Sequence, residues 1–122
     1  MEEMRGIRRI IKAFGYSISG LKAAWASEEA FRQETIISVP IIAAGLWLGA
    51  TWTQRALLIG AWCIVIITEL INSAIEAITD RIGSEHHILS GKAKDLGSAA
   101  VLISICMCII IWGIIAGERF LD

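Results

Sequence analysis

Residues 56–80 read ALLIGAWCIVIITELINSAIEAITD, and this stretch changes character part-way along. Its first half carries no charge, whereas its second half carries polar side chains spaced i, i+3, i+4, i+7 and i+11. This spacing places five residues on one face of an α-helix: Glu69, Asn72, Ser73, Glu76 and Asp80. A carboxylate at the centre of a bilayer costs about 2.5 to 3.5 kcal/mol, so Glu69 and Glu76 in an apolar helix indicate a functional site.

The chain as a whole is too apolar for an ordinary soluble domain of 122 residues, with 56% hydrophobic side chains and a mean hydropathy of +0.66. Besides residues 56–79, the stretches 35–54 and 96–117 are uncharged and long enough to cross a bilayer core, which takes about 20 residues. We therefore predict an all-α membrane protein with one domain, residues 1–122. Its transmembrane helices are expected at about 29–50, 53–82 and 92–118.

The N-terminal segment 5–26 has the pattern of an amphipathic surface helix. Its apolar and basic side chains fall mostly on different faces: Ile7, Ile10, Ile11, Phe14, Ile18, Leu21 and Trp25 against Arg5, Arg8, Arg9, Lys12 and Lys22. Such a helix lies in the membrane interface, where each basic residue contributes about 1 kcal/mol on an anionic surface. The segment lacks the features of a cleavable signal peptide, so we expect the mature protein to keep it.

The basic residues also predict the orientation of the chain. Of the 11 Lys and Arg residues, all but Arg55 and Arg119 precede the uncharged stretch 35–54 or lie between residues 79 and 96. The positive-inside rule then places the N-terminus and the 80–95 loop in the cytoplasm and the C-terminus outside. The polar face of residues 69–80 would open toward the compartment that holds ATP.

The oxygen-rich polar face is suited to a hard cation, because Mg²⁺ commonly binds one or two carboxylates together with water and substrate phosphates. Lys94 and Asp95 open the third predicted span at the same membrane level, and Lys94 is expected to hold a phosphate as a point charge. Glu28 would add a carboxylate if the start of the first span folds over this face. Two other interpretations stay open: polar side chains that only bind helices together, and a proton or cation pathway.

Three other features of the sequence do not point to a further function. The segment GSEHHILSGKA, residues 83–93, contains Gly-Lys but neither the earlier glycine nor the following Ser or Thr of a P-loop. The balance of 11 basic and 12 acidic side chains gives no indication of a nucleic-acid partner. Cys63, Cys106 and Cys108 lie in apolar runs and do not form a disulfide pattern.

Three segments carry a resemblance to a known family. They read ELINSAIEAITDRIGSEHHILSGKAKDLGSAAV at 69–101, GYSISGLKAAW at 15–25 and EEAFRQE at 28–34, and they closely resemble the bacterial integral-membrane diacylglycerol kinases. The resemblance extends over nearly the whole chain. It implies a homotrimer in the bacterial inner membrane, with three transmembrane helices and one surface helix per subunit, and active sites formed between neighbouring subunits.

The same resemblance assigns roles to residues. Glu69 matches the proposed general base on the lipid hydroxyl, and Glu28 and Glu76 match the residues that bind the metal ions accompanying ATP. Further active-site positions are Asn72, Lys94 and Asp95, and the nucleotide-contacting positions are Arg9, Tyr16, Glu85, His86 and His87 with Lys94 and Asp95. Lipid contacts are expected from Arg9, Ser17, Ala30, Phe31, Arg32, Gln33, Glu34, Glu69, Ser98 and Trp112.

The predicted function is ATP-dependent phosphorylation of a membrane lipid alcohol, 1,2-diacylglycerol to phosphatidic acid, with Mg²⁺. Such a reaction depends on charge neutralisation and an aligned acceptor more than on covalent chemistry. Glu69 lies roughly 10 Å along the helix from Glu76, at about 1.5 Å per residue, so a lipid hydroxyl and a triphosphate can meet there. Undecaprenol kinases share this architecture and remain an alternative, and a small cation- or proton-conducting membrane protein is an alternative of a different class.

Overall fold

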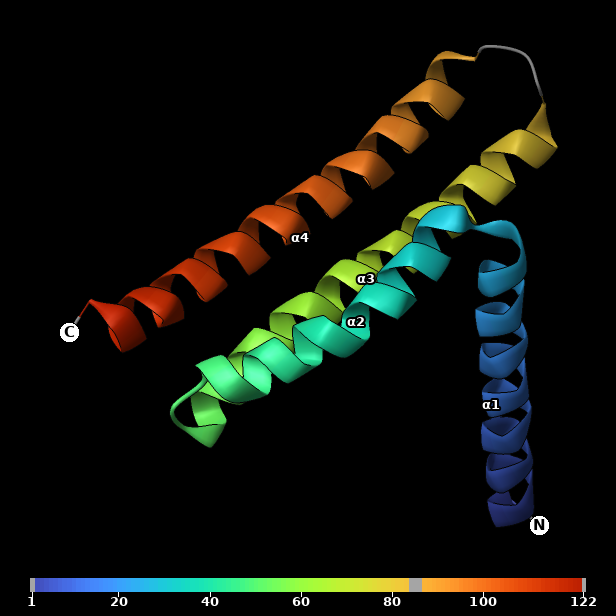
Figure 1. Cartoon of the computed structure of the whole chain (residues 1–122). Coiled ribbons are helices and arrows are strands. Elements are labelled where there is room, and N and C mark those ends of the chain that lie inside the picture. Colours follow the sequence, from blue (N-terminus) through green and yellow to red (C-terminus); the bar gives the residue numbers. More distant parts are fainter. Residues whose placement is uncertain (1, 84–86, 122) are drawn as a thin grey trace.

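The structure is a computed structural model that describes residues 2–83 and 87–121. Four helices account for nearly all of these residues: α1 (Glu2–Ser27), α2 (Glu29–Leu48), α3 (Trp52–Ile82) and α4 (Ile88–Phe120) (Figure 1). The prediction of an all-α fold is confirmed. α4 begins at Ile88 rather than near residue 92, and α2 ends at Leu48 rather than near residue 50.

The helices α2, α3 and α4 run alongside one another, whereas α1 leaves the bundle at the start of α2 (Figure 1). α3 packs against both α2 and α4, and its contact with α4 is the most extensive in the chain. α3 and α4 continue beyond the point where α2 begins (Figure 1). We call this end of the bundle, where α1 and α2 meet beside α3, the stepped end.

A turn of residues 49–51 joins α2 to α3 at the opposite end. Thr51 is the N-cap of α3, and its side chain accepts a hydrogen bond from the Gln54 backbone N–H at 3.1 Å. Gln54 Oε1 in turn accepts from the Ala50 N–H at 2.7 Å. Residue 49 is a glycine because a β-carbon there would lie 2.9 Å from the Arg55 backbone nitrogen. A tight antiparallel connection therefore joins these two helices.

Two arginines close this end of the bundle, which we call the clasp end. The last carbonyls of a helix have no partner within it. Here Arg55 Nε donates to Leu46 O at 3.0 Å, and Arg119 Nη1 donates to Leu48 O at 3.3 Å.

Further contacts hold the same residues in place. Arg55 lies 4.5 Å over the Trp52 ring, and Arg119 lies 4.9 Å over the Trp47 ring. Gln54 Nε2 also donates to Glu118 Oε2 at 2.9 Å. The two basic residues that stand apart from the others in the sequence thus cap α2.

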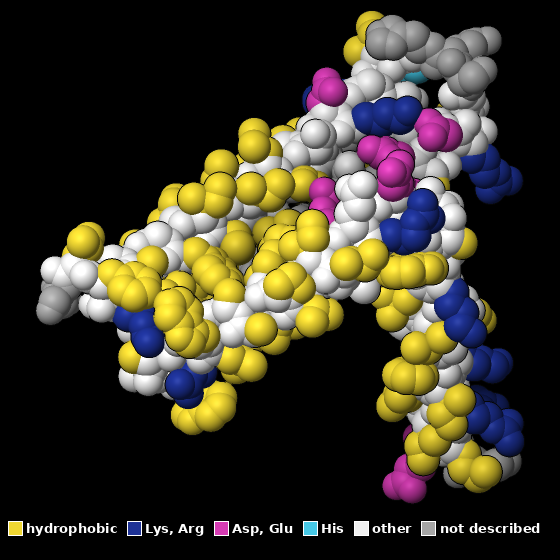
Figure 2. All heavy atoms as spheres, viewed as in Figure 1, with side chains coloured by type: hydrophobic (Ala, Val, Ile, Leu, Met, Phe, Trp, Pro, Cys, Tyr) yellow, Lys and Arg dark blue, Asp and Glu magenta, His cyan; other side chains and the backbone are white. Residues whose placement is uncertain are grey.

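The packed interior is small. Leu48, Leu58 and Ile115 form its centre, and Trp112 packs against them while its indole N–H donates to Leu58 O at 3.1 Å. Two side-chain hydrogen bonds join the helices farther along: Trp62 Nε1 donates to Ser38 Oγ at 2.8 Å, and the hydroxyls of Thr68 and Ser104 lie 2.9 Å apart. Most large apolar side chains of the bundle face outward (Figure 2). A surface of this kind is matched to lipid rather than to water.

Two helices, α3 and α4, are long and apolar enough to cross a membrane, with mean hydropathies of 2.0 and 2.8. α2 does not meet the same criterion, because Arg32, Gln33 and Glu34 occupy its first turns. It nevertheless runs unbroken through Pro40 and lies along α3. The crossing of α2 stays a prediction.

Helix α1 is amphipathic, as predicted, and is unbroken from Glu2 to Ser27 through Gly15 and Gly20. Its apolar side chains lie along one side and its basic side chains along the other (Figure 2). Both sets are exposed: Ile10 keeps 71% and Phe14 67% of their accessible surface. The bundle therefore leaves the apolar face of α1 uncovered, and its place in the membrane interface stays a prediction.

Candidate active site

The junction between α1 and α2 consists of one non-helical residue, Glu28. Its backbone N–H still donates to Ala24 O at 2.8 Å, so the chain turns immediately after the last turn of α1. Arg32 stabilises the turn, since its Nη1 donates to Trp25 O at 2.7 Å and to Ala26 O at 3.1 Å. This geometry brings Glu28 against α3.

A cavity of about 150 Å³ lies at this junction, and we call it the acidic cavity. Its lining residues come from the junction and start of α2 on one side and from α3 on the other: Glu28, Ala30 and Phe31, and Glu69, Leu70, Asn72, Ser73 and Glu76. Four of the five residues on the predicted polar face of α3 line it, and Asp80 does not. The cavity thus joins three carboxyl groups, two of them from α3 and one from the junction.

Within the cavity, Asn72 is bonded to Glu76. Asn72 Nδ2 donates to Glu76 Oε1 at 3.3 Å, across one turn of α3. The amide thereby restricts the Glu76 carboxylate, which keeps its other oxygen for a ligand. The opposite end of the amide, Asn72 Oδ1, is buried and has no hydrogen-bond partner among the residues that the structure describes.

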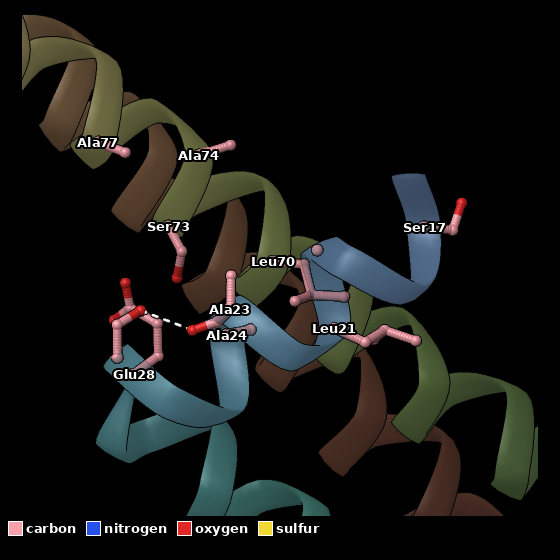
Figure 3. Close-up of a pocket in the computed structure, with 11 residues that line it drawn as sticks. Ser17, Leu21, Ala23, Ala24, Glu28, Leu70, Ser73, Ala74 and Ala77 are labelled. Carbon is pink, nitrogen blue, oxygen red and sulfur yellow. Dashed lines mark hydrogen bonds between the residues drawn. The ribbon is translucent and has the colours of Figure 1, made fainter. Parts of the chain in front are cut away.

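A larger cavity of about 540 Å³ adjoins the first and lies between α1 and α3 (Figure 3); we call it the adjoining groove. Small side chains line most of it: Ser17, Gly20, Leu21, Ala23, Ala24 and Ser27 from α1, Leu70, Ser73, Ala74 and Ala77 from α3, and Glu28 between them. In Figure 3 the side chains of Glu28 and Ser73 point toward one another. Together with Leu70, these two residues line both cavities and mark where the two meet.

The comparison with known proteins identifies the family of this chain. The family model described as prokaryotic diacylglycerol kinase matches residues 15–116. A diacylglycerol kinase of Escherichia coli strain K12 is 52% identical over 115 residues, which is 94% of each chain. The chain belongs to the prokaryotic diacylglycerol kinase family.

Other relatives agree with this assignment. A diacylglycerol kinase of Haemophilus influenzae is 42% identical over 113 residues, 93% of this chain and 96% of the relative. One of Pseudomonas aeruginosa is 42% identical over 110 residues, 90% of this chain and 89% of the relative. The family predicted from the sequence is confirmed, and the protein is an enzyme of the kinase class. With its apolar helices α3 and α4, it is also a membrane protein.

The residues predicted to contact lipid lie in different places in this kinase. Ala30 and Phe31 line the acidic cavity and Ser17 lines the adjoining groove. Arg32 caps α1, and Gln33 is exposed. Glu34 is half-buried, with one carboxylate oxygen that has no partner within the described ranges 2–83 and 87–121. Ser98 is exposed on α4, and Trp112 lies near the clasp end.

The start of α4 lies outside the acidic cavity of its own chain. Lys94 Nζ pairs with Asp80 Oδ1 at 2.7 Å, an exposed ion pair that joins α4 to the end of α3, and Asp95 is exposed.

The predicted nucleotide contacts also lie away from both cavities where the structure describes them. Arg9 and Tyr16 on α1 are exposed and line neither cavity. His87 is the N-cap of α4, where its Nδ1 accepts from the Leu89 N–H at 3.1 Å. The predicted residues Glu85 and His86 lie outside the described residues.

Sequence reasoning left two features of the site undetected. Ser73 was placed on the polar face of α3 without a role, yet it lines both cavities. Gly97 carries no distinguishing signal in the sequence, yet it is buried and lies directly against Asn72. The signal for Ser73 was its spacing of four residues from Glu69. The position of Gly97 depends on how α3 and α4 pack, which the sequence does not specify.

The acidic cavity fits the predicted metal. Glu28 and Glu76 supply carboxylate oxygens from two elements to one cavity, and Mg²⁺ binds one or two such groups while it keeps water and phosphate ligands. Among the described residues, no three His, Cys, Asp or Glu side chains lie together so that they could hold a metal ion by themselves. A cation that takes most of its ligands from a nucleotide is therefore a better fit than a structural metal.

Proposed function

We propose that this kinase transfers the γ-phosphoryl group of ATP to the hydroxyl of 1,2-diacylglycerol and forms phosphatidic acid in the acidic cavity. The observation that carries the proposal is the convergence of Glu28, Glu69 and Glu76 in one cavity of about 150 Å³. Helix packing alone does not require three carboxyl groups at one place in an apolar bundle, where each is costly. Diacylglycerol is favoured as the acceptor because the relatives described above are named diacylglycerol kinases.

Glu69 acts as the general base. Its carboxylate removes the proton from the lipid hydroxyl as the hydroxyl oxygen attacks the γ-phosphorus, the bond from that phosphorus to the β,γ-bridging oxygen breaks, and ADP leaves. Glu69 lies deeper in the bundle than Glu76, by roughly 10 Å along α3. Phe31 and Leu70 line the same cavity and supply apolar surface beside it. These positions suit an acceptor that enters from the membrane.

Glu28 and Glu76 would hold the Mg²⁺ that accompanies ATP. When bound, the ion would neutralise the negative charge on the transferred phosphoryl group. Asn72 supports Glu76 through their 3.3 Å hydrogen bond. Glu28 is also the junction residue between α1 and α2, so the proposed metal ligand directly follows the surface helix in the chain.

The adjoining groove is the proposed nucleotide site. Its volume of about 540 Å³ is within the usual range for small-molecule sites, roughly 300 to 1,000 Å³, and it meets the acidic cavity at Glu28 and Ser73. The predicted nucleotide contacts Arg9 and Tyr16 lie farther along α1, the helix that forms one wall. A nucleotide that lies along α1 would have its triphosphate directed toward Glu28.

The active enzyme is proposed to be a homotrimer with sites shared between subunits. Lys94, Asp95 and Ser98 are predicted site residues, and all three are exposed at the start of α4, outside the cavity of their own chain. A neighbouring subunit that brings this part of α4 to the acidic cavity would complete the site. In this assembly α2, α3 and α4 all cross the bacterial inner membrane, with the N-terminus in the cytoplasm and the C-terminus in the periplasm.

The test is a kinase assay in mixed detergent micelles with radiolabelled ATP, in which diacylglycerol and undecaprenol are offered separately. We expect Mg²⁺-dependent formation of phosphatidic acid and little label in undecaprenyl phosphate. Label mainly in undecaprenol would overturn the substrate, and no transfer to either lipid would overturn the reaction. Cation or proton flux through reconstituted vesicles without ATP turnover would favour the conducting protein instead.

A further inference from the structure

Gly97 lies in an unusually close contact between α3 and α4. It is buried, and a β-carbon built at this position would overlap Asn72 Oδ1, while it would lie 3.3 Å from Asn72 Cγ and 3.4 Å from Ile75 Cδ1. Among the other glycines of α4, Gly113 has no such neighbour within 4 Å. The absence of a side chain at residue 97 therefore permits the Asn72 amide to pack directly against α4.

The chemistry of Glu76 fixes which end of the amide meets Gly97. A carboxylate accepts hydrogen bonds and donates none, so the amide must present Nδ2 to Glu76, as it does at 3.3 Å. Oδ1 is then the end that faces Gly97, where it is buried and has no hydrogen-bond partner in the described part of the chain. The contact with α4 thus holds Asn72 in place by packing and not by a second hydrogen bond.

Asn72 also separates two cavities. On one side is the acidic cavity, and on the other is a cavity of about 180 Å³ between α3 and α4, lined by Thr68, Ile71, Asn72, Ile75, Leu96, Gly97 and Ala100. Any side chain at residue 97 would push the amide away from α4 and toward the acidic cavity. That movement would change the position of the Glu76 carboxylate.

We propose that Gly97 is a positioning residue for catalysis. By leaving room for the Asn72 amide, it sets the orientation of Glu76 and hence the affinity of the site for its divalent cation. The inference rests on the proposed function, in which Glu76 is a metal ligand. Gly97 itself touches neither substrate nor metal.

The test compares Gly97→Ala with Gly113→Ala. Both substitutions exchange glycine for alanine within α4, so their effects on helix propensity are matched. Groups that orient a metal ligand typically change metal affinity by about 10- to 100-fold when altered, and we expect Gly97→Ala to raise the Mg²⁺ concentration for half-maximal activity by at least about tenfold. Mn²⁺ binding to the purified trimer, measured by EPR in the presence of a non-hydrolysable ATP analogue, should weaken in parallel. Gly113→Ala should leave both values unchanged.

A second substitution identifies the contact that is responsible. In an Asn72→Ala background the amide is gone, so adding Gly97→Ala should produce no further loss of Mn²⁺ affinity. If the two effects are additive, Gly97 does not act through Asn72. If Gly97→Ala alone fails to fold, the double variant should fold because the overlap is removed, and its failure would also overturn the inference.

The outcome for Glu76→Gln separates this inference from the proposed function. If Glu76→Gln leaves the Mg²⁺ requirement unaltered, the metal role of Glu76 is wrong and the inference about Gly97 is wrong with it. If Glu76→Gln raises the requirement but Gly97→Ala behaves like Gly113→Ala, the inference about Gly97 alone is overturned.

Discussion

The clasp end and the stepped end of the bundle differ in whether their polar groups have hydrogen-bond partners within the chain. At the clasp end, the charged side chains that the structure describes, Arg55, Glu118 and Arg119, all have hydrogen-bond partners within the chain. At the stepped end, carboxyl groups gather around a cavity, and oxygens of Glu34 and Asn72 are buried without a partner among the described residues. Acidic and basic side chains crowd the surface there (Figure 2).

This difference separates stability from function along one short bundle. A polar group that is already satisfied within the protein contributes to the fold, and its loss costs stability. A buried polar group that lacks a partner is costly to the fold, so its retention indicates a role other than stability. Substitutions at the clasp end should therefore change the stability of the kinase, and substitutions at the stepped end should change its catalysis.

The largest effect is expected from Glu69→Gln at the stepped end. Loss of a general base should lower kcat by roughly 10²- to 10⁴-fold, while the KM for ATP stays nearly the same, because Glu69 is proposed to act on the lipid hydroxyl. Steady-state kinetics in mixed micelles measure both values. Glu118→Gln is the matched change at the clasp end and should leave kcat unaltered. Equal losses in kcat and ATP affinity would show that Glu69 does not have a separate role.

The carboxylates proposed for the metal should give the next largest effect. Glu28→Gln and Glu76→Gln should each raise the Mg²⁺ requirement by about 10- to 100-fold, because a neutral amide is a poorer ligand for a hard cation. A Mg²⁺ titration at saturating ATP and lipid measures this change. A variant with the wild-type Mg²⁺ dependence would remove that residue from the metal site.

A comparison of Lys94→Ala with Asp80→Asn tests whether Lys94 belongs to catalysis or only to its ion pair. Charge-assisted bonds to phosphate are strong, so Lys94→Ala should raise the KM for ATP by about tenfold. Asp80→Asn removes the negative charge that lies 2.7 Å from Lys94 Nζ but keeps the ammonium group for phosphate, so the KM for ATP should change little. If both variants lose the same ATP affinity, the ion pair itself is what the site needs.

At the clasp end, Arg55→Ala should reduce stability without reducing kcat. The substitution removes the 3.0 Å bond to Leu46 O and the contact with the Trp52 ring. A hydrogen bond to a charged group contributes about 1.5 to 3 kcal/mol to the free energy of unfolding, and unfolding in SDS would measure the loss. Arg8→Ala, on the exposed surface of α1, serves as the control. A fall in kcat of correctly folded Arg55→Ala would break the separation of the two ends.

The smallest effect is expected between the ends, from Thr68→Val. The change preserves shape and removes the 2.9 Å bond between the Thr68 and Ser104 hydroxyls. Side-chain hydrogen bonds between membrane helices average about 0.6 kcal/mol, so stability should fall by that amount and kinetics should stay as in wild type. Thr35→Val should cost less, because the Thr35 hydroxyl donates to Phe31 O within its own helix.

Features that repeat along one helix were the ones that the sequence could predict. Glu69, Asn72 and Glu76 lie on one face of α3 because helical geometry requires it, and the amphipathic pattern of residues 5–26 identified α1 before any contact was known. Each of these depends on neighbours within a few residues.

Features that depend on how two helices meet could not be predicted in the same way. The role of Glu28 was conditional on the fold of the α1–α2 junction, and no local pattern predicts that Arg32 bonds to the end of α1. The contact of Gly97 with Asn72 is set by the register of α4 against α3, which no local pattern encodes. Lys94 was expected near phosphate, and within one chain it pairs with Asp80.

The single-residue link between α1 and α2 also limits how the length of the chain can change. Each residue advances a helix by about 100°, so one amino acid inserted into the last turns of α1 would rotate the whole preceding helix by that angle about its axis. The side chains that should face lipid would then turn toward water. Insertion of seven residues, close to two full turns, would nearly restore the original orientation, so the tolerated lengths of this segment should differ by helical repeats rather than by single residues.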